Sequence, residues 1–340
     1  MLGQYFAAMY PSKVSRLVID GVVDANDYRA GEWYSTLDDT DAVLLSFFEF
    51  CHRAGPSKCP LYGSTVPSIR KRVDTIIDSL SQAPVPIPFS SKGPVMITKK
   101  VLHQLMFGVL YSPTMAFPIL ANSLIAVETD NISALTDIAD QFFDLGVECS
   151  CASPLPWQQF VSMSATFAIA CGDADKHPNG PDDYKSYFDK LMAKSAFAAP
   201  IWGVNYLACS EWKMTPKWRY TGPFAANTSY PLLIITTKFD PVCPLTNAKA
   251  AQKQYAGSAL LVQNSYGHCT TSSPSLCTAK HIRAYFREGT LPAAGTACEV
   301  EELPFIGEVE NDVKVLSSED VELLEALRAL ARVVPRFGLV

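Results

Sequence analysis

The sequence has no block of like charges and no long uncharged apolar run. Its 28 basic and 34 acidic residues are spread over 340 positions and give a net charge of −6. A nucleic-acid groove or a patch for anionic membranes needs clustered Lys and Arg, so we expect neither partner. A membrane span needs roughly 18 or more consecutive apolar residues, and no run reaches that length. Hydrophobic residues still make up 48% of the chain, which predicts a folded globular protein.

An export signal is also missing from the N-terminal residues. The opening sequence MLGQYFAAMYP has no basic region, no long apolar region and no small-residue cleavage site. The ten cysteines and 24 prolines are nevertheless typical of proteins from oxidising compartments. Asn131 and Asn227 each open an acceptor triplet for N-glycosylation, which agrees with that location. We therefore predict a secreted protein whose beginning, with its signal peptide, is missing from this chain.

Zinc binding is the competing use of the cysteines. Cys149 and Cys151 form a C-x-C pair, but no histidine stands at ligand spacing to a second pair. Disulfide bonds explain the even number of cysteines better, and we expect no metal ion and no cofactor.

The two ends of the chain alternate strand and helix patterns as an α/β fold does. Residues 231–237 and 259–262 are short β-branched apolar runs typical of buried parallel strands. Helices are predicted after them over 247–255 and 277–287. Near the N-terminus, a helix is predicted over 2–9 and a strand over 16–23. An α/β domain normally has a strand before its first helix, so this start also predicts an upstream segment.

Residues 24–229 carry helical patterns and Pro-rich loops instead. Thr40 is expected to cap a helix whose apolar face runs from Val43 to Cys51. Further helices are predicted over 69–80, 101–110, 117–127 and 184–193, and the Pro-rich stretch 84–88 is predicted to be extended. We interpret this region as one mostly helical module.

The last helical pattern begins at Ser317 or Ser318, either of which can cap it. Its apolar side is formed by Leu323, Leu324, Leu327, Leu330 and Val334, with charged residues between them. Those charges indicate a helix that docks on the protein.

Two polar residues each follow a predicted buried strand. Asp240 lies just after the 231–237 strand, and His268 lies just after the 259–262 strand. Ligands and catalytic groups of open α/β sheets gather at the carboxyl ends of strands, and an acid followed by a histidine is the order found in α/β-hydrolase triads. Either residue alone is also an ordinary turn residue, because Asp-Pro and Gly-His are common in surface loops.

No nucleophile accompanies this pair. The chain contains no G-x-S-x-G, the motif that places a reactive serine on a sharp strand-to-helix turn. Gly63-Ser64 and Gly257-Ser258 lack the second glycine, and a disulfide is the simpler use of Cys269. The residues alone therefore indicate an acid and a base without a serine.

Short motifs at both ends of the chain carry a family likeness. The N-terminal ones are Leu2-Gly3, Tyr5 to Pro11 and Leu17-Val18-Ile19-Asp20-Gly21-Val22. The C-terminal ones are Asp240-Pro241-Val242, Gly267-His268, Ala284-Tyr285-Phe286 and Gly289-Thr290-Leu291-Pro292 with Cys298. Together they resemble secreted tripeptidyl/prolyl aminopeptidase-like α/β hydrolases of fungi and actinomycetes.

The resemblance implies the C-terminal part of an α/β-hydrolase fold, with an incomplete, mostly parallel sheet and a large helical cap insertion. Residues 1–23 and 230–290 would form the hydrolase core, 24–229 the cap, and 291–340 a C-terminal extension with the amphipathic helix. Asp240 would be the triad acid and His268 the base, with the serine elbow lying just before Met1. The implied disulfides are Cys277–Cys298, Cys51–Cys59, Cys171–Cys209 and Cys243–Cys269.

Several functions follow from this resemblance and stay open. One is a serine hydrolase that forms an acyl-enzyme on peptides, truncated and inactive as the isolated chain. Another is an ester or amide hydrolase that acts on a small natural product. A third is a non-catalytic protein that binds a ligand or a separate N-terminal half. A half sheet with an unpaired edge also allows that the chain does not fold alone.

Overall fold

The chain folds into two compact units. The computed structural model describes residues 1–91, 93–142, 163–214, 216–309 and 316–332. Unit 1 comprises Met1–Asp41, Val147–Gln263 and Thr278–Cys298, and unit 2 comprises Ala42–Gly146, Asn264–Cys277 and Glu299–Val340. The helical region expected over 24–229 therefore contributes residues to both units.

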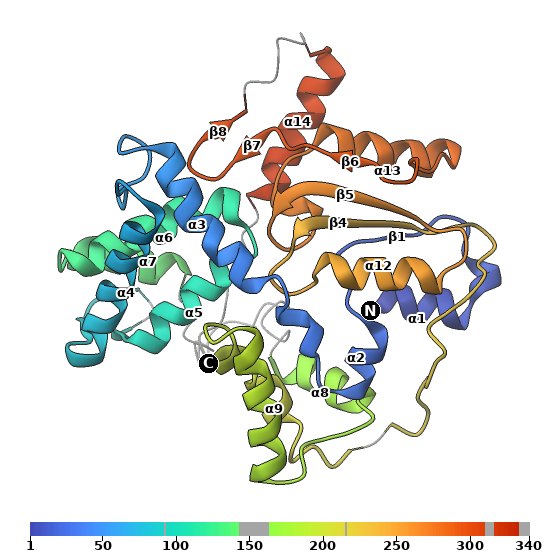
Figure 1. Cartoon of the computed structure of the whole chain (residues 1–340), viewed down its shortest axis with the longest axis horizontal. Helices are drawn as coiled ribbons and strands as arrows, with labels where there is room; N and C mark the ends of the chain where they lie inside the picture. Colours follow the sequence, from blue (N-terminus) through green and yellow to red (C-terminus); the bar gives the residue numbers. More distant parts are fainter. Residues whose placement is uncertain (92, 143–162, 215, 310–315, 333–340) are drawn as a thin grey trace, which may run out of the picture. The chain divides into compact units, whose positions relative to one another are not determined.

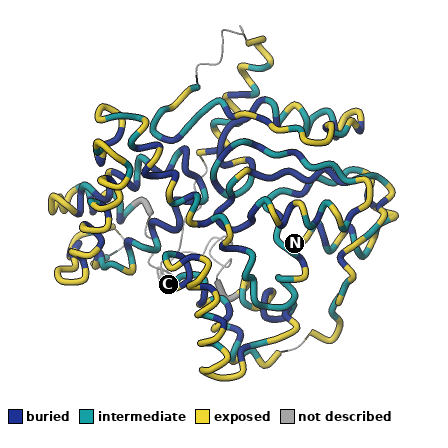
Figure 2. The backbone as a smooth tube through the Cα atoms, viewed as in Figure 1, coloured by how far each residue is buried: buried dark blue, intermediate teal, exposed yellow. Residues whose placement is uncertain are grey.

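Unit 1 is built on a four-stranded sheet. Its strands lie in the order β1 (Val18–Ile19), β4 (Leu233–Phe239), β5 (Ala259–Tyr266) and β6 (Ala297–Cys298), as Figure 1 shows. The β1–β4 and β5–β6 pairs are parallel, with Val18 opposite Leu233 and Val262 opposite Ala297. The first five residues of β4 are all buried, as its apolar sequence predicts for a strand covered on both faces, and they are dark blue in Figure 2. The predicted strands at 231–237 and 259–262 are confirmed, whereas β1 is shorter than predicted.

Helices predicted at both ends of the chain are confirmed in position. They are α1 (Leu2–Met9), α12 (Leu245–Gln254) and α13 (Leu276–Glu288). A core cluster joins Ala7 of α1 and Ala248 of α12 to Ile19 and Ile234 of the sheet. Tyr255 belongs to the same cluster, is fully buried, and donates its hydroxyl to the carbonyl of Gln4 at 2.9 Å. Helices distant in the sequence are thus held on one side of β1 and β4.

Tyr285 of α13 connects the helix to the residues that precede strands β1 and β4. Its side chain is fully buried, and its hydroxyl donates to the Pro231 carbonyl at 2.8 Å and accepts from the Leu17 N–H at 3.0 Å. Arg16 adds a second contact, because its Nε donates to the Tyr285 carbonyl at 2.9 Å. One phenol therefore satisfies the backbone just before β1 and just before β4.

We predict that Tyr285→Phe lowers the free energy of unfolding by about 1–3 kcal/mol, because the half-buried Leu17 N–H and Pro231 carbonyl both lose their hydrogen bond to the phenol. Urea unfolding of the whole chain measures this loss. Tyr62→Phe is the matched control, since the Tyr62 side chain is 37% exposed. Equal stability of the two variants would contradict the role of the Tyr285 hydroxyl.

The remaining helices of unit 1 follow β1 or precede β4. They are α2 (Ala25–Ala30), the 3-10 helix η2 (Tyr34–Leu37), α8 (Met163–Asp173), α9 (Pro181–Lys194), α10 (Ala199–Trp202) and α11 (Val204–Ala208). The Cys171–Cys209 disulfide joins α8 to the residue after α11, with the two Cα atoms 5.3 Å apart. Residues 143–162 lie outside the described parts, so Cys149 and Cys151 are not placed.

Unit 2 is mainly helical. Its elements are α3 (Thr40–Ala54), α4 (Val66–Gln82), the antiparallel pair β2 (Val85–Ile87) and β3 (Val95–Ile97), α5 (Lys99–Val109), α6 (Pro113–Glu128) and α7 (Ile132–Phe142). Ile69, Val73, Ile76 and Leu80 of α4 are buried at helical spacing, as predicted. The Cys51–Cys59 disulfide closes the turn after α3. The predicted extended stretch at 84–88 forms β2, whereas α7 has no counterpart among the predicted helices.

Unit 2 ends with a small hairpin and a helix. These are β7 (Glu302–Leu303), β8 (Gly307–Glu308) and α14 (Ser318–Ala331). Ser317 caps α14 by accepting from the Asp320 N–H, which confirms the first of the two predicted caps. Of the predicted apolar face, Leu324 is buried while Leu330 is 49% exposed, and Val334 lies outside the described residues. No helix in the described ranges combines the length and apolar character that crossing a membrane requires.

Candidate active site

Asp240 directly follows β4 and is almost fully buried, with 1% of its surface exposed. Its Oδ1 accepts from the N–H groups of Val242 and Cys243 at 2.9 and 2.8 Å. A buried carboxylate needs such donors, because without them the loss of hydration strongly disfavours it. The turn that leads into α12 therefore forms around this carboxylate and fixes its orientation.

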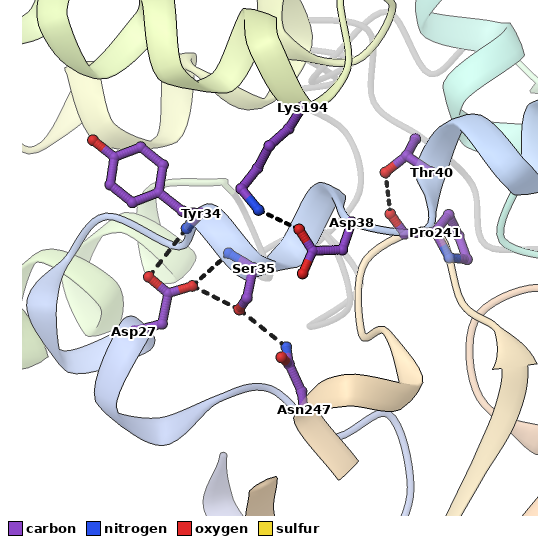
Figure 3. Close-up of polar contacts among 8 residues, drawn as sticks. All are labelled: Asp27, Tyr34, Ser35, Asp38, Thr40, Lys194, Pro241 and Asn247. Atoms are coloured by element: carbon purple, nitrogen blue, oxygen red, sulfur yellow. Dashed lines mark hydrogen bonds and ion pairs between the residues drawn. The ribbon is translucent and has the colours of Figure 1, made fainter. Parts of the chain in front are cut away.

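Residues 34–40, which we call the η2 segment, contact the Asp240 turn and α12 (Figure 3). Thr40, fully buried just after η2, donates its hydroxyl to the Pro241 carbonyl at 2.6 Å. Ser35 accepts from Asn247 of α12 at 3.1 Å and donates to Asp27 at 2.6 Å. The sequence predicts Thr40 as a helix cap, but α3 begins at Thr40 itself. Its hydroxyl bonds the Pro241 carbonyl, which is distant along the chain, and not an N–H group of its own helix.

We predict that Thr40→Val lowers the free energy of unfolding by about 1–3 kcal/mol, because the buried Pro241 carbonyl loses its donor without a large change in volume. Thr40→Ser keeps the hydroxyl and should lose less stability. Urea unfolding of both variants measures the difference. If the Ser and Val variants lose equal stability, the hydroxyl does not hold the turn.

Asp39 is a second carboxyl beside the same turn. Burial raises its pKa, and the negative charges of Asp38 and Asp240 raise it further, against the opposing effect of a hydrogen bond from the Leu245 N–H. Lys194 of α9 forms an ion pair with Asp38 (Figure 3). Negative charge therefore accumulates around the N-terminal end of α12, and Asp39 is the carboxyl that this environment holds back from ionising.

Asp39→Asn should therefore stabilise the chain at neutral pH. A carboxyl whose pKa is higher in the folded state costs stability as the pH rises from its unfolded to its folded value, and the cost vanishes at lower pH. The amide can still accept from Leu245, so we expect a gain within about 0.5 kcal/mol. Thermal unfolding at pH 7 and near pH 4 checks this, with Asp137→Asn at an exposed position as control. A gain that does not shrink toward pH 4 would contradict it.

His268 lies in unit 2, two residues beyond Tyr266, the last residue of β5. Its N–H donates to the Tyr111 carbonyl at 2.8 Å, and its ring meets the Tyr111 ring edge to face at 5.1 Å between centroids. Residues on both sides have positive φ, 115° at Gly267 and 64° at Cys269. A Cβ at Gly267 would lie 2.6 Å from Pro113 Cδ, so glycine is required there. The His268 side chain thus extends from a sharply bent loop.

Each of the two predicted catalytic residues therefore follows a strand, Asp240 after β4 in unit 1 and His268 after β5 in unit 2. Their roles as acid and base stay predictions. Sequence reasoning missed Thr40 and Tyr111 as their supports, because both come from segments far away along the chain and neither belongs to a motif.

The cysteines correct one of the implied pairings. Cys51–Cys59 and Cys171–Cys209 are disulfides, and Cys277 and Cys298 are each disulfide-bonded, as their implied bridge requires. The expectation of a Cys243–Cys269 bridge is not met, because both residues are thiols. The Asp240 carboxylate already fastens the backbone at Cys243, so this turn is held without a covalent link.

The two candidate glycosylation sites are accessible. Asn131 and Asn227 are both exposed. Asn131 also accepts from the Ala134 N–H at 3.1 Å and so caps α7. Exposure is what a carbohydrate chain needs, and glycosylation itself stays a prediction.

The fold and a match to a protein family indicate the same class of protein. A mostly parallel sheet with helices, whose strands end at an acid and a histidine, is an α/β-hydrolase-type fold with helical regions. Residues 195–298 match the family model of TAP-like proteins, an α/β-hydrolase family, and both Asp240 and His268 fall inside this stretch. The match supports a hydrolase of this general kind. No curated protein matches the chain.

Proposed function

We propose that this chain carries the acid and the general base of a serine hydrolase that cleaves peptides in the manner of tripeptidyl or prolyl aminopeptidases. The observation that carries the proposal is the position of Asp240 and His268, each just beyond a strand and both within the stretch matched by the TAP-like family. In this role the buried Asp240, held by two backbone donors, orients the imidazole of His268 and stabilises its charged form.

The reaction needs a serine hydroxyl as the attacking group. Its oxygen bonds to the substrate carbonyl carbon while His268 takes the hydroxyl proton and then gives it to the leaving amine as the C–N bond breaks. Water attacks the acyl-enzyme by the same route, and the acid product leaves as the serine regains its proton.

The serine is the part that residues 1–340 do not supply in a recognisable form, since no G-x-S-x-G occurs among them. The proposal places it on polypeptide outside these residues, either ahead of them or on a separate chain. Residues 1–340 alone then bind substrate or a partner but do not turn substrate over. The same chemistry cleaves esters and amides of small molecules, so a natural-product hydrolase is the alternative within this class.

A secreted protein fits the proposal. Disulfides persist in oxidising compartments and are rare in reducing ones. The exposed Asn131 and Asn227 are in agreement with passage through a glycosylating pathway.

Reaction with a fluorophosphonate probe, which modifies activated serines, tests the proposal. The protein isolated from its natural source is analysed by intact mass and N-terminal sequence beside recombinant residues 1–340. We expect the probe to modify a serine outside residues 1–340 in the native protein and to leave the recombinant chain unmodified. Hydrolysis of a tripeptide p-nitroanilide by the native form should fall by about 10⁴-fold in Asp240→Asn or His268→Ala.

Two controls sharpen this test. An N-acetylated tripeptide and a p-nitrophenyl ester separate an aminopeptidase, which needs the free amine, from an ester hydrolase. Half-buried His281→Ala tests whether loss of any histidine lowers the rate, since His281 lies within helix α13 and does not follow a strand. Modification of a serine within residues 1–340, or undiminished hydrolysis by His268→Ala, would overturn the assignment.

A further inference from the structure

The corner between α5 and α6 contacts the loop that carries His268. We define the corner as residues 110–114 and the histidine loop as residues 267–273, and both belong to unit 2. The corner is a tight turn, with the Tyr111 N–H donating to Gly108 and the Ser112 N–H to Val109. Pro113 then begins α6, where a residue without an N–H is favoured. The position of Tyr111 is therefore set by two helices and not by a free loop.

Four contacts join the corner to the histidine loop. The His268 N–H donates to the Tyr111 carbonyl, and the two rings meet edge to face. Thr114 Oγ1 and Ser273 Oγ share a hydrogen bond of 2.6 Å, and both side chains are buried. Gly267 packs so closely on Pro113 that no side chain fits between them. The loop is thus attached before, at and after the histidine.

The loop also carries an uncommon backbone conformation. Cys269, a non-glycine residue, has a φ of 64°, and Gly267 has a φ of 115°. Non-glycine residues in this region are strained and persist only where surrounding contacts impose them. The corner supplies such contacts on both sides of Cys269, because Thr114 holds Ser273 and Tyr111 holds His268. The uncommon backbone conformation therefore lies next to His268, whose side-chain direction matters for the proposed function.

We propose that Tyr111 is the positioning residue of His268. Its carbonyl fixes the backbone of the histidine, and its ring fixes the plane of the imidazole. Edge-to-face pairs at centroid distances of 4.5–7 Å are attractive and directional, so the ring selects one orientation of the imidazole among its broad χ2 range. The proposal rests on the function proposed above, since a general base must point one nitrogen at the proton that it takes. Tyr111 touches the base and not the reacting atoms.

Nuclear magnetic resonance of the histidine rings tests this on the folded chain, without any turnover. The chain has five histidines, so labelling their Cε1 gives five signals, and His268→Gln identifies the one of interest. Tyr111→Ala removes the ring but keeps the carbonyl, and it should shift the His268 signal more than any other histidine signal. Tyr111→Phe keeps the ring and should leave the His268 signal near its wild-type position.

A matched control comes from another tyrosine–histidine ring pair in unit 2. The Tyr62 ring lies parallel to the His52 ring at 5.8 Å between centroids. Tyr62→Ala should shift the His52 signal and leave the His268 signal in place. Tyr111→Leu fills the space of the ring without its edge, so it covers the case in which the Ala variant fails to fold.

The outcomes separate the two proposals. An unchanged His268 signal in Tyr111→Ala and Tyr111→Leu, or an equal shift in Tyr111→Phe, overturns the positioning role. In the native protein, Tyr111→Ala should lower kcat by about 10²-fold with little change in KM, and Tyr111→Phe should restore it. If Tyr111→Ala moves the signal while His268→Ala hydrolyses peptides normally, the proposed function fails and the positioning of the ring stands.

Discussion

The burial of β4 is the constraint on which the candidate acid depends. Five consecutive apolar or β-branched residues are covered on both faces, and β1 and β5 satisfy the backbone on both edges. A strand covered in this way cannot slip by one residue without exposing backbone or turning side chains to the other face. The residue that follows its end is therefore placed as firmly as the strand itself. Asp240 takes that place, and its two backbone donors make an otherwise costly buried charge tolerable.

The loops around the candidate residues obey a different rule, because no regular hydrogen-bond ladder fixes them. Each is held by a polar group from a helical segment far away along the chain, Thr40 for the acid turn and Tyr111 for the histidine loop. Both contacts reach a backbone group of the loop, so they control where the chain runs and not only where one side chain points. The strands thus place Asp240 and His268, and contacts from helical segments hold the loops that carry these residues.

The sequence predicts β4, β5 and the residues that follow them, because these depend on local patterns. Apolar β-branched runs indicate β4 and β5, and a residue just past a strand end needs no long-range information to be recognised. Thr40 shows where this fails. Its local context indicates a helix cap, and only the folded chain brings the Pro241 carbonyl within reach of its hydroxyl. The Cys243–Cys269 expectation also fails, because the positions of cysteines along a sequence do not fix which of them pair.

The helical residues therefore contribute more than a surface for substrate. A residue that only shapes a pocket changes KM when it is substituted, whereas one that orients an acid or a base changes kcat. In the proposed function, Thr40 and Tyr111 would belong to the second kind by their contacts, although both lie outside the stretch that matches the TAP-like family. A helical segment could thus vary to admit new substrates only where it leaves these two contacts in place.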